Sequence, residues 1–203
     1  MDTLATGLAR YFSPAQIAAL KKVEVGIIGA GGLGSNVAMM LARSGFLRLT
    51  IADPDIVDAS NLNRQCYWPN DVGEPKVLAL SRRLLALEPG MRMVIHQLAV
   101  TSANALPLFG QCPIVVEAVD DADTKVMLYT VFSPVKDLYV TASGVSGTGR
   151  GPMASARPRS NVVAVGDFSL PADGGNPPLA PRVTQAAAMQ ADAVLAHVLS
   201  SVS

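Results

Sequence analysis

The chain alternates short apolar runs with longer segments whose apolar residues recur at helical spacing. Apolar runs of this kind are typical of strands buried in a parallel sheet, and the periodic segments are typical of the helices that connect them. The expected strands are 23–28, 47–52, 93–98, 114–119, 138–142 and 162–165. The expected helices are 4–22, 32–44, 75–87, 102–108, 121–135 and 183–199, with Ser13-Pro14 opening a second short helix inside the first segment.

This alternation predicts an α/β fold with a doubly wound, mainly parallel sheet that contains a Rossmann-like nucleotide-binding half. We expect residues 1–203 to form one domain, with 1–22 as an N-terminal helical arm. Residues 143–181 are rich in Gly, Pro, Ser and Arg, which predicts a long loop region interrupted only by strand 162–165. A loop of this length in a compact domain is usually functional or disordered.

Glycines cluster directly after the first expected strand, in the stretch Gly29-Ala30-Gly31-Gly32-Leu33-Gly34-Ser35. At this position glycines permit a tight turn, close approach of a phosphate to the backbone and close packing of the following helix. The free N–H groups at the start of that helix attract a phosphate. The second strand is followed by Asp53, at the spacing where an acidic side chain accepts ribose hydroxyls. The combination predicts a nucleotide site, and the alternative is a plain strand-to-helix turn.

Further charges follow the expected strands at the edge of the sheet where ligands of open α/β proteins bind. Arg64 offers a planar donor fork for phosphate oxygens, and Lys76 offers a compact charge near a helix start. Asp120 follows strand 114–119, and its carboxylate could hold Mg²⁺, which prefers one or two carboxylates together with substrate phosphates. Taken singly, each charge could instead be a solvated surface residue. Taken together, these charges favour a nucleoside triphosphate over a dinucleotide as the ligand of the site.

Composition narrows the class of protein. Sixteen basic and sixteen acidic residues cancel, so no overall field attracts nucleic acid or an anionic membrane. The two cysteines, Cys66 and Cys112, are too few for a disulfide framework, and we expect a cytoplasmic protein in which both thiols serve packing. We expect no secretory leader and no membrane span, because polar residues interrupt the apolar segment 183–202.

The motifs together resemble the ThiF/MoeB/HesA family, the bacterial relatives of ubiquitin-activating enzymes. The resemblance covers about residues 10–145 closely, and it rests on the segments 29–35, 52–55, 60–65, 73–76 and 119–121. The later stretches 141–144, 165–168 and 180–183 resemble a short ThiF subfamily that adenylates the sulfur carrier of thiamine biosynthesis.

The resemblance implies roles for the residues of the predicted site. Asp53 would bind the ribose, Arg64 and Lys76 the phosphates, and Asp120 the magnesium and the α-phosphate region. The side chains expected to line the same pocket are Asp55, Asn61 and Gln65.

Members of the family use ATP and Mg²⁺ to adenylate the C-terminal Gly-Gly carboxylate of a small ubiquitin-like sulfur carrier, and they release pyrophosphate. The resemblance therefore implies a nucleotidyltransferase with a ThiS-like carrier as its partner, working as a homodimer. No general base is needed, since a carboxylate is already ionised at neutral pH. The protein supplies positioning and compensates charge on the phosphate oxygens.

Three departures from the family pattern leave alternatives open. Relatives often bind a structural zinc through two C-x-x-C pairs, which two cysteines cannot form, so we expect no zinc. An arginine that often follows an N-terminal Arg-Tyr pair is missing, because Phe12 follows Arg10-Tyr11. No cysteine lies beyond strand 138–142 to take the carrier as a covalent adduct. The alternatives are a catalytically weak or regulatory nucleotide-binding homologue, an NAD-dependent oxidoreductase, and an enzyme that activates another acid or a tRNA.

Overall fold

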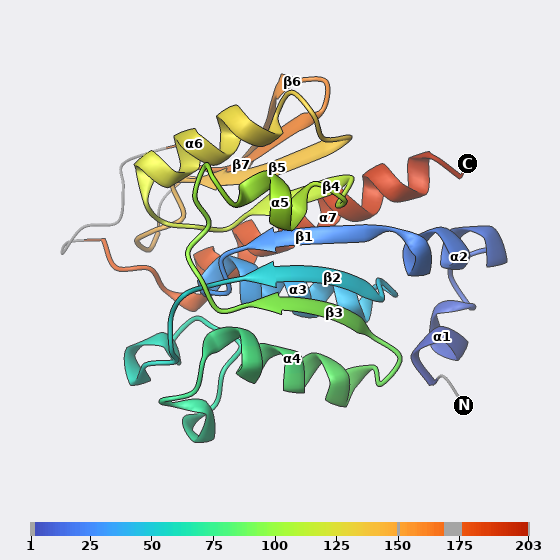
Figure 1. Cartoon of the computed structure of the whole chain (residues 1–203), viewed down its shortest axis with the longest axis horizontal. Coiled ribbons are helices and arrows are strands. Elements are labelled where there is room, and N and C mark those ends of the chain that lie inside the picture. Colours follow the sequence, from blue (N-terminus) through green and yellow to red (C-terminus); the bar gives the residue numbers. More distant parts are fainter. Residues whose placement is uncertain (1–2, 150, 169–175, 203) are drawn as a thin grey trace.

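One seven-stranded sheet forms the centre of the computed structural model, which describes residues 3–149, 151–168 and 176–202 (Figure 1). The strands are β1 (Glu24–Ile28), β2 (Arg48–Ala52), β3 (Arg92–His96), β4 (Ile114–Glu117), β5 (Leu138–Ser143), β6 (Ala154–Arg159) and β7 (Val162–Gly166). Their spatial order is β3-β2-β1-β4-β5-β7-β6, and every pairing is parallel except that of β6 with β7.

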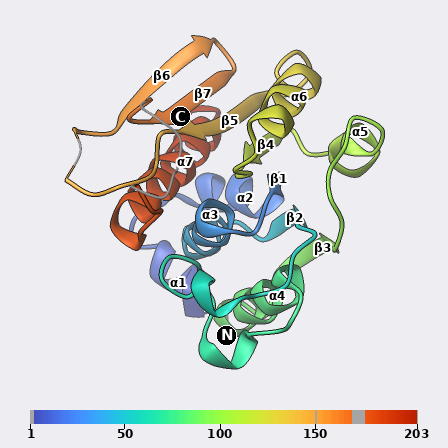
Figure 2. The ribbon, with the colours of Figure 1, turned by 90° about the vertical axis from the view of Figure 1, so that its left-hand side faces the viewer.

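Helices cover both faces of this sheet (Figure 2). They are α1 (Thr3–Leu8), α2 (Pro14–Lys22), α3 (Gly32–Arg43), α4 (Lys76–Leu87), α5 (Ala105–Phe109), α6 (Ala122–Phe132) and α7 (Ala180–Ser200), with short 3₁₀ turns η1 (Ala59–Asn61) and η2 (Pro69–Asp71). Helices α3, α4 and α7 pack on one face and α5 and α6 on the other, each over its own apolar core. Alternate strand residues enter the two cores, as in β5, where Val140 faces the first and Tyr139 the second. The predicted α/β, doubly wound, mainly parallel fold is therefore confirmed.

The segment 143–181 differs from the long loop expected there. β7 lies close to the expected strand 162–165, but β6 was not expected, and it pairs antiparallel with β7 at the edge of the sheet. β6 is exposed along its whole length and contains Pro158, so its sequence lacks the apolar alternation that would indicate a strand. Residues 150 and 169–175 of the segment lie outside the described residues.

Helix α7 begins earlier than the expected 183, because Pro181 occupies the first turn, where a helix tolerates proline. Among the described residues, no helix is both long enough and apolar enough to cross a membrane. The helix expected to open at Ser13-Pro14 is α2: the Ser13 hydroxyl accepts the Gln16 N–H at 3.2 Å and caps it.

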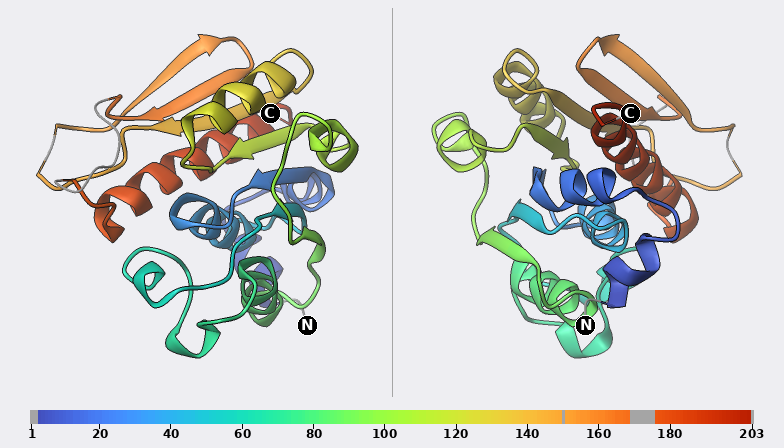
Figure 3. Two further views of the ribbon diagram at one scale, coloured as in Figure 1. Left: turned by 60° about the vertical axis from the view of Figure 1, so that its left-hand side comes forward. Right: turned by 90° about the vertical axis from the view of Figure 1, so that its right-hand side faces the viewer.

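The order of the strands places the carboxyl ends of β1, β2 and β4 side by side. In the parallel register, Ile28 of β1 lies opposite both Ala52 of β2 and Glu117 of β4. The segments that leave β1, β2 and β4 therefore emerge at one edge, at the point where the strand order reverses direction. Figure 2 faces this edge, and the left view of Figure 3 also turns it forward. It is where Asp53 and Asp120 follow their strands.

The turn from β1 into α3 depends on close backbone contact. Gly29 has φ +97°, a conformation that side chains with a Cβ rarely adopt. A Cβ at position 34 would lie 1.8 Å from the carbonyl oxygen of Gly29, which is closer than any non-bonded contact allows. Glycine at position 34 therefore lets α3 begin directly beneath the end of β1.

We predict that Gly34→Ala destabilises the protein, because the new methyl group meets backbone that cannot move aside. Overpacking typically costs about 1–3 kcal/mol, and this contact is more severe than most. Urea unfolding followed by circular dichroism measures the change. Gly7→Ala in α1 is the matched control, because nothing lies within 4 Å of its Cβ position and alanine favours a helix. Equal unfolding free energies for the two variants would contradict this account of the turn.

Candidate functional site

A cleft of about 690 Å³ opens at the carboxyl edge of the sheet. This volume suits a small-molecule ligand. The cleft brings together residues from distant parts of the chain, including the ends of β1, β2, β4 and β5. The predicted site residues that line it are Gly29, Gly31, Gly32, Asp53, Asp55, Asn61, Arg64, Gln65, Lys76 and Asp120.

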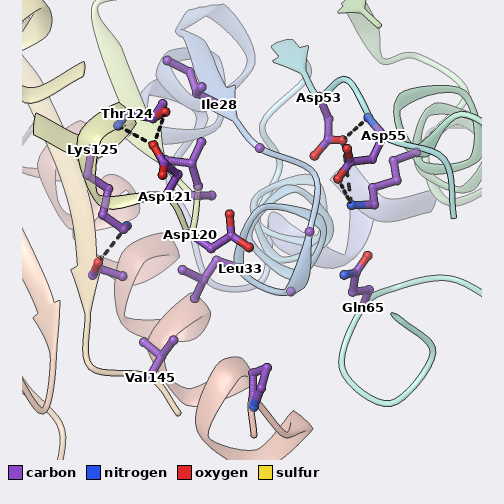
Figure 4. Close-up of a pocket in the computed structure, with 18 of the residues that line it drawn as sticks. Ile28, Leu33, Asp53, Asp55, Gln65, Asp120, Asp121, Thr124, Lys125 and Val145 are labelled. Carbon is purple, nitrogen blue, oxygen red and sulfur yellow. Dashed lines mark hydrogen bonds and ion pairs between the residues drawn. The ribbon is translucent and has the colours of Figure 1, made fainter. Parts of the chain in front are cut away.

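Gly34 is the predicted binding residue that does not line the cleft. It is buried in the first turn of α3, where its contact with Gly29 serves packing. Figure 4 labels four of the others: Asp53 and Asp55 lie on one side, and Asp120 points into the open centre from the opposite side. Gln65 lies below the two aspartates.

Asp53 is a buried carboxylate that holds the glycine loop in place. Its Oδ2 accepts the N–H of Ala30 at 2.6 Å, and its Oδ1 accepts the N–H of Asp55 at 2.9 Å. Burial raises the pKa of Asp53, although the hydrogen bond from Ala30 and the nearby ammonium group of Lys76 oppose that shift. Asp53 is only 5% exposed, so the part that reaches the cleft is small and well oriented.

The two cations predicted to bind phosphate are engaged with acceptors of this chain. The Lys76 Nζ lies 2.7 Å from Asp55 Oδ2 and 3.9 Å from Asp53 Oδ1. The guanidinium of Arg64 donates to the carbonyl of Ser60 at 3.2 Å and to Asn63 Oδ1 at 2.8 Å. The Asp55 side chain is 61% exposed, so an anion that enters the cleft can take its place at Lys76.

Asp120 and Asp121 follow β4 together but have different environments. Asp121 caps α6, because its Oδ2 accepts both the N–H and the hydroxyl of Thr124 at 2.7 Å, and these bonds lower the pKa of Asp121. Asp120 is exposed, and it makes no hydrogen bond within the described part of the chain. Its carboxylate is therefore available to a ligand.

Magnesium fits this arrangement only as an ion shared with a substrate. Across residues 3–149, 151–168 and 176–202, no three His, Cys, Asp or Glu side chains are grouped to hold a metal ion. A single carboxylate such as Asp120, completed by substrate phosphates and water, is the coordination that Mg²⁺ accepts.

Three further residues shape the site and were not predicted from the sequence. The Tyr67 hydroxyl donates to the carbonyl of Ala30 at 2.7 Å and lies 3.3 Å from the carbonyl of Lys76. Burial raises the pKa of Tyr67, so this hydroxyl stays protonated as a donor.

Glu117 is completely buried at the end of β4 and pairs with Lys125, which lines the cleft. An acid inside an apolar strand was the one signal in the sequence that pointed to this pair.

Cys66 is close to the cleft, but its chemistry is that of a packed thiol. Its Sγ lies 3.2 Å from Asn36 Oδ1, and its N–H donates to the Ser35 hydroxyl at 3.1 Å. Burial raises the pKa of the Cys66 thiol, which disfavours the thiolate needed of a nucleophile.

Comparison with known proteins gives a family and several relatives. The sequence profile of the ThiF family matches residues 5–200. A sulfur carrier protein adenylyltransferase of Thermus thermophilus is 40% identical over 110 residues, which are 54% of this chain and 41% of the relative. A probable adenylyltransferase/sulfurtransferase MoeZ of Mycobacterium tuberculosis is 36% identical over 110 residues, 54% of this chain and 28% of the relative. The chain thus matches less than half the length of these relatives.

Solved structures share the fold at low sequence identity. The Escherichia coli tRNA N6-threonylcarbamoyladenosine dehydratase TcdA superposes with a TM-score of 0.85 at 19% identity, over 97% of this chain and 94% of that one. The same enzyme in complex with ATP gives a TM-score of 0.84 at 22% identity, over the same shares of both chains. Escherichia coli MccB, in a structure with AMPCPP and MccA, gives 0.73 at 22% identity, over 91% of this chain and 58% of that one.

We predict that Tyr67→Phe lowers the unfolding free energy by about 1–3 kcal/mol, because the buried carbonyl of Ala30 loses its donor. Thermal unfolding measures the change. Tyr139→Phe is the matched control, since Tyr139 is also buried but its hydroxyl has no hydrogen-bond partner among the described residues. That substitution should be neutral or stabilising. The assigned contact is wrong if Tyr67→Phe is as stable as Tyr139→Phe.

Proposed function

The chain belongs to the ThiF family, and we propose that it is an ATP-dependent adenylyltransferase that activates the C-terminal carboxylate of a ubiquitin-like sulfur carrier. One observation carries the proposal. A glycine loop at a helix start, two cations and an unpaired carboxylate line one cleft. An NAD-dependent oxidoreductase would have no use for Arg64, Lys76 and Asp120 at these positions.

ATP would lie along the carboxyl edge of the sheet. The N-terminus of α3 and its glycines would receive phosphate, with Asp53 at the ribose. Lys76 would exchange Asp55 for a phosphate oxygen, and Arg64 would add a second positive charge. Asp120 would hold the magnesium ion, which when bound neutralises charge on the phosphate oxygens.

The proposed reaction requires positioning rather than proton transfer. A carboxylate oxygen of the carrier attacks the α-phosphorus, the bond from that phosphorus to the bridging oxygen of the β-phosphate breaks, and pyrophosphate leaves. The products are an acyl-adenylate and pyrophosphate, and no proton moves in the step. Lys76 and Arg64 would stabilise the charge that shifts onto the departing phosphates. The protonated state of Cys66 agrees with a step that uses no protein thiol.

The charges at the cleft favour a protein tail over a tRNA as the substrate. Among the lining residues, Asp55, Asp120 and Asp121 are exposed, whereas Lys76 is buried and paired. A tRNA would need a basic surface to compensate its phosphates. The chain carries no net charge, so no such surface arises from its overall composition. TcdA, which is named for a tRNA substrate, resembles this chain only at the level of the fold.

The loop that follows β5 is the proposed entry for the carrier tail. Ser143–Ser146 and Pro178 line the cleft, and Gly144 has no Cβ, which lets another chain approach its backbone closely. Phe168 lies beside this loop, because its N–H donates to the carbonyl of Ser143 at 3.4 Å. It is 46% exposed, and its φ of +55° is strained for a bulky side chain. An exposed, strained aromatic at this place suits contact with an extended peptide.

The finer assignments rest on the sequence alone. The stretches 141–144, 165–168 and 180–183 support a ThiS-like carrier of thiamine biosynthesis, and family resemblance supports a homodimer. A regulatory homologue without turnover is the second candidate. It is favoured by the sequence, because Phe12 follows Arg10-Tyr11 at the place where relatives often carry an arginine that reaches ATP across a dimer.

We predict that ATP with Mg²⁺ binds and that NAD does not. Lys76→Met should weaken ATP about 10-fold or more, since a hydrogen bond to a charged group contributes about 1.5–3 kcal/mol. Isothermal titration calorimetry measures both affinities. Lys22→Met, on the exposed side of α2, is the control and should bind ATP as the wild type does. Tight NAD binding without ATP binding would contradict the adenylation proposal.

We predict that Asp120→Asn lowers carrier-dependent ATP–pyrophosphate exchange about 100-fold or more, because an unpaired carboxylate at the phosphates is lost. Asp123→Asn removes the same charge from an exposed position in the first turn of α6 and serves as the control. Cys66→Ser should also retain exchange. Wild-type ATP binding without exchange with any carrier would favour the regulatory homologue, and full exchange by Asp120→Asn would exclude the role given to Asp120.

A further inference from the structure

Glu117 is a charged residue in the most buried part of the sheet. It ends β4, is 0% exposed, and follows the apolar residues Val115 and Val116. Its carboxylate accepts the N–H of Val119 at 2.8 Å and the hydroxyl of Thr141 at 2.5 Å. Both oxygens also accept from the ammonium group of one lysine, so three donor groups converge on this carboxylate.

The lysine is Lys125, and its ammonium group has a partner for each of its N–H donors. Its Nζ lies 2.8 Å and 3.0 Å from the two oxygens of Glu117 and 3.0 Å from the carbonyl oxygen of Ala142. An ammonium group has three N–H donors, and all three have partners here. Lys125 therefore lines the cleft without a proton to offer a phosphate, which distinguishes it from Lys76.

The pair connects the two walls of the cleft that would flank the reacting atoms. Through Glu117 and Val119 it fixes the segment that leaves β4 and carries Asp120. Through Thr141 and Ala142 it fixes the end of β5, from which the proposed entry loop departs. Helix α7 also contacts the end of β4, because Gln190 Nε2 donates to the carbonyl of Glu117 at 2.9 Å.

Stability alone does not account for a buried ion pair at this position. Replacing such a pair by apolar residues of similar volume is often neutral or stabilising, since desolvation offsets the attraction between the charges. The adjacent strand positions carry valines. An ion pair adds a fixed geometry here. The ammonium group of Lys125 has three acceptors, so it holds α6, the end of β4 and the end of β5 in one relative orientation.

We propose that Lys125, acting with Glu117, is a positioning residue for adenylation that sets Asp120 and the Ser143–Ser146 loop at the correct separation around the α-phosphorus. The inference rests on the proposed function. Lys125 would contact neither ATP nor the carrier, so its loss should lower the rate of the chemical step and leave ATP binding nearly unchanged.

Steady-state ATP–pyrophosphate exchange in the full-length protein tests the proposal. Lys125→Met should lower kcat on the order of 100-fold, the cost of an ångström-scale misplacement, with the KM for ATP changed less than about 3-fold. Lys125→Arg should recover a large part of kcat, because a guanidinium can also bridge a carboxylate and a carbonyl. A kcat within about 3-fold of wild type for folded Lys125→Met would overturn the proposal.

Lys136→Met is the matched control. Lys136 is also buried and donates to the carbonyls of Phe109 at 2.6 Å and Gly110 at 3.0 Å, but it precedes β5 at the opposite edge of the sheet. Its loss should lower the melting temperature without lowering kcat. If Lys125→Met does not fold, the double variant Glu117→Gln/Lys125→Met removes the unpaired buried charge. That variant should fold and still show the reduced kcat, and wild-type kcat in it would refute the positioning role.

Hydrogen exchange in the ATP-free protein separates this inference from the proposed function. If the wild type shows no exchange activity with any carrier, the proposed function fails, but the link between the two walls remains measurable. Lys125→Met should then speed amide exchange in 118–121 and in 142–146 together, with no change in α4, which packs on α3 and β3 at the other half of the sheet. Unchanged protection in both segments would overturn the link itself.

Discussion

The backbone of Ala30 is held through both its N–H and its carbonyl, and the geometry of the cleft depends on these two bonds. Its N–H donates to Asp53 at the end of β2, and its carbonyl accepts the hydroxyl of Tyr67 from the polar segment that follows. These two bonds fix the glycine loop between β1 and α3, while the contact of Gly34 with Gly29 brings the helix start directly beneath the strand. The free N–H groups of α3 therefore face the cleft in a fixed direction before any ligand arrives.

Two lysines divide the electrostatic roles at this edge of the sheet. Lys76 pairs with Asp55, whose side chain is largely exposed, so the pair can open when a phosphate competes for the ammonium group. Lys125 pairs with Glu117, which is completely buried, so opening that pair would leave an uncompensated charge inside the protein. In the proposed function, Lys76 would exchange its partner for a substrate phosphate and Lys125 would orient the walls of the cleft. This division agrees with an adenylation step that needs placement and charge compensation and no protein base or thiol.

The sequence predicted the fold because its signals are local. Buried parallel strands are apolar runs, and the glycine stretch between 23–28 and 32–44 marks the nucleotide half without reference to the rest of the chain. The edge strand β6 was missed because exposed residues on both faces leave no period to detect. Tyr67 was missed because its partner Ala30 lies 37 residues away in sequence. Lys125 follows Glu117 by only eight residues, but their contact requires α6 to pack back against the end of β4, which no local pattern predicts. Arg64 and Lys76 could be identified as candidates from their residue type and position, whereas their acceptors depend on the conformation of the segment 53–65, which has no periodic pattern.

The fate of the carboxylate oxygen tests the central claim most directly. A carrier labelled with a heavy oxygen isotope in its C-terminal carboxylate is incubated with the protein, ATP and Mg²⁺, and hydroxylamine then discharges any acyl-adenylate at its carbonyl carbon. If the carboxylate attacks the α-phosphorus, the bridging oxygen stays with phosphorus, and mass spectrometry finds one heavy oxygen in the released AMP. Unlabelled AMP, or release of ADP and phosphate in its place, would contradict the account.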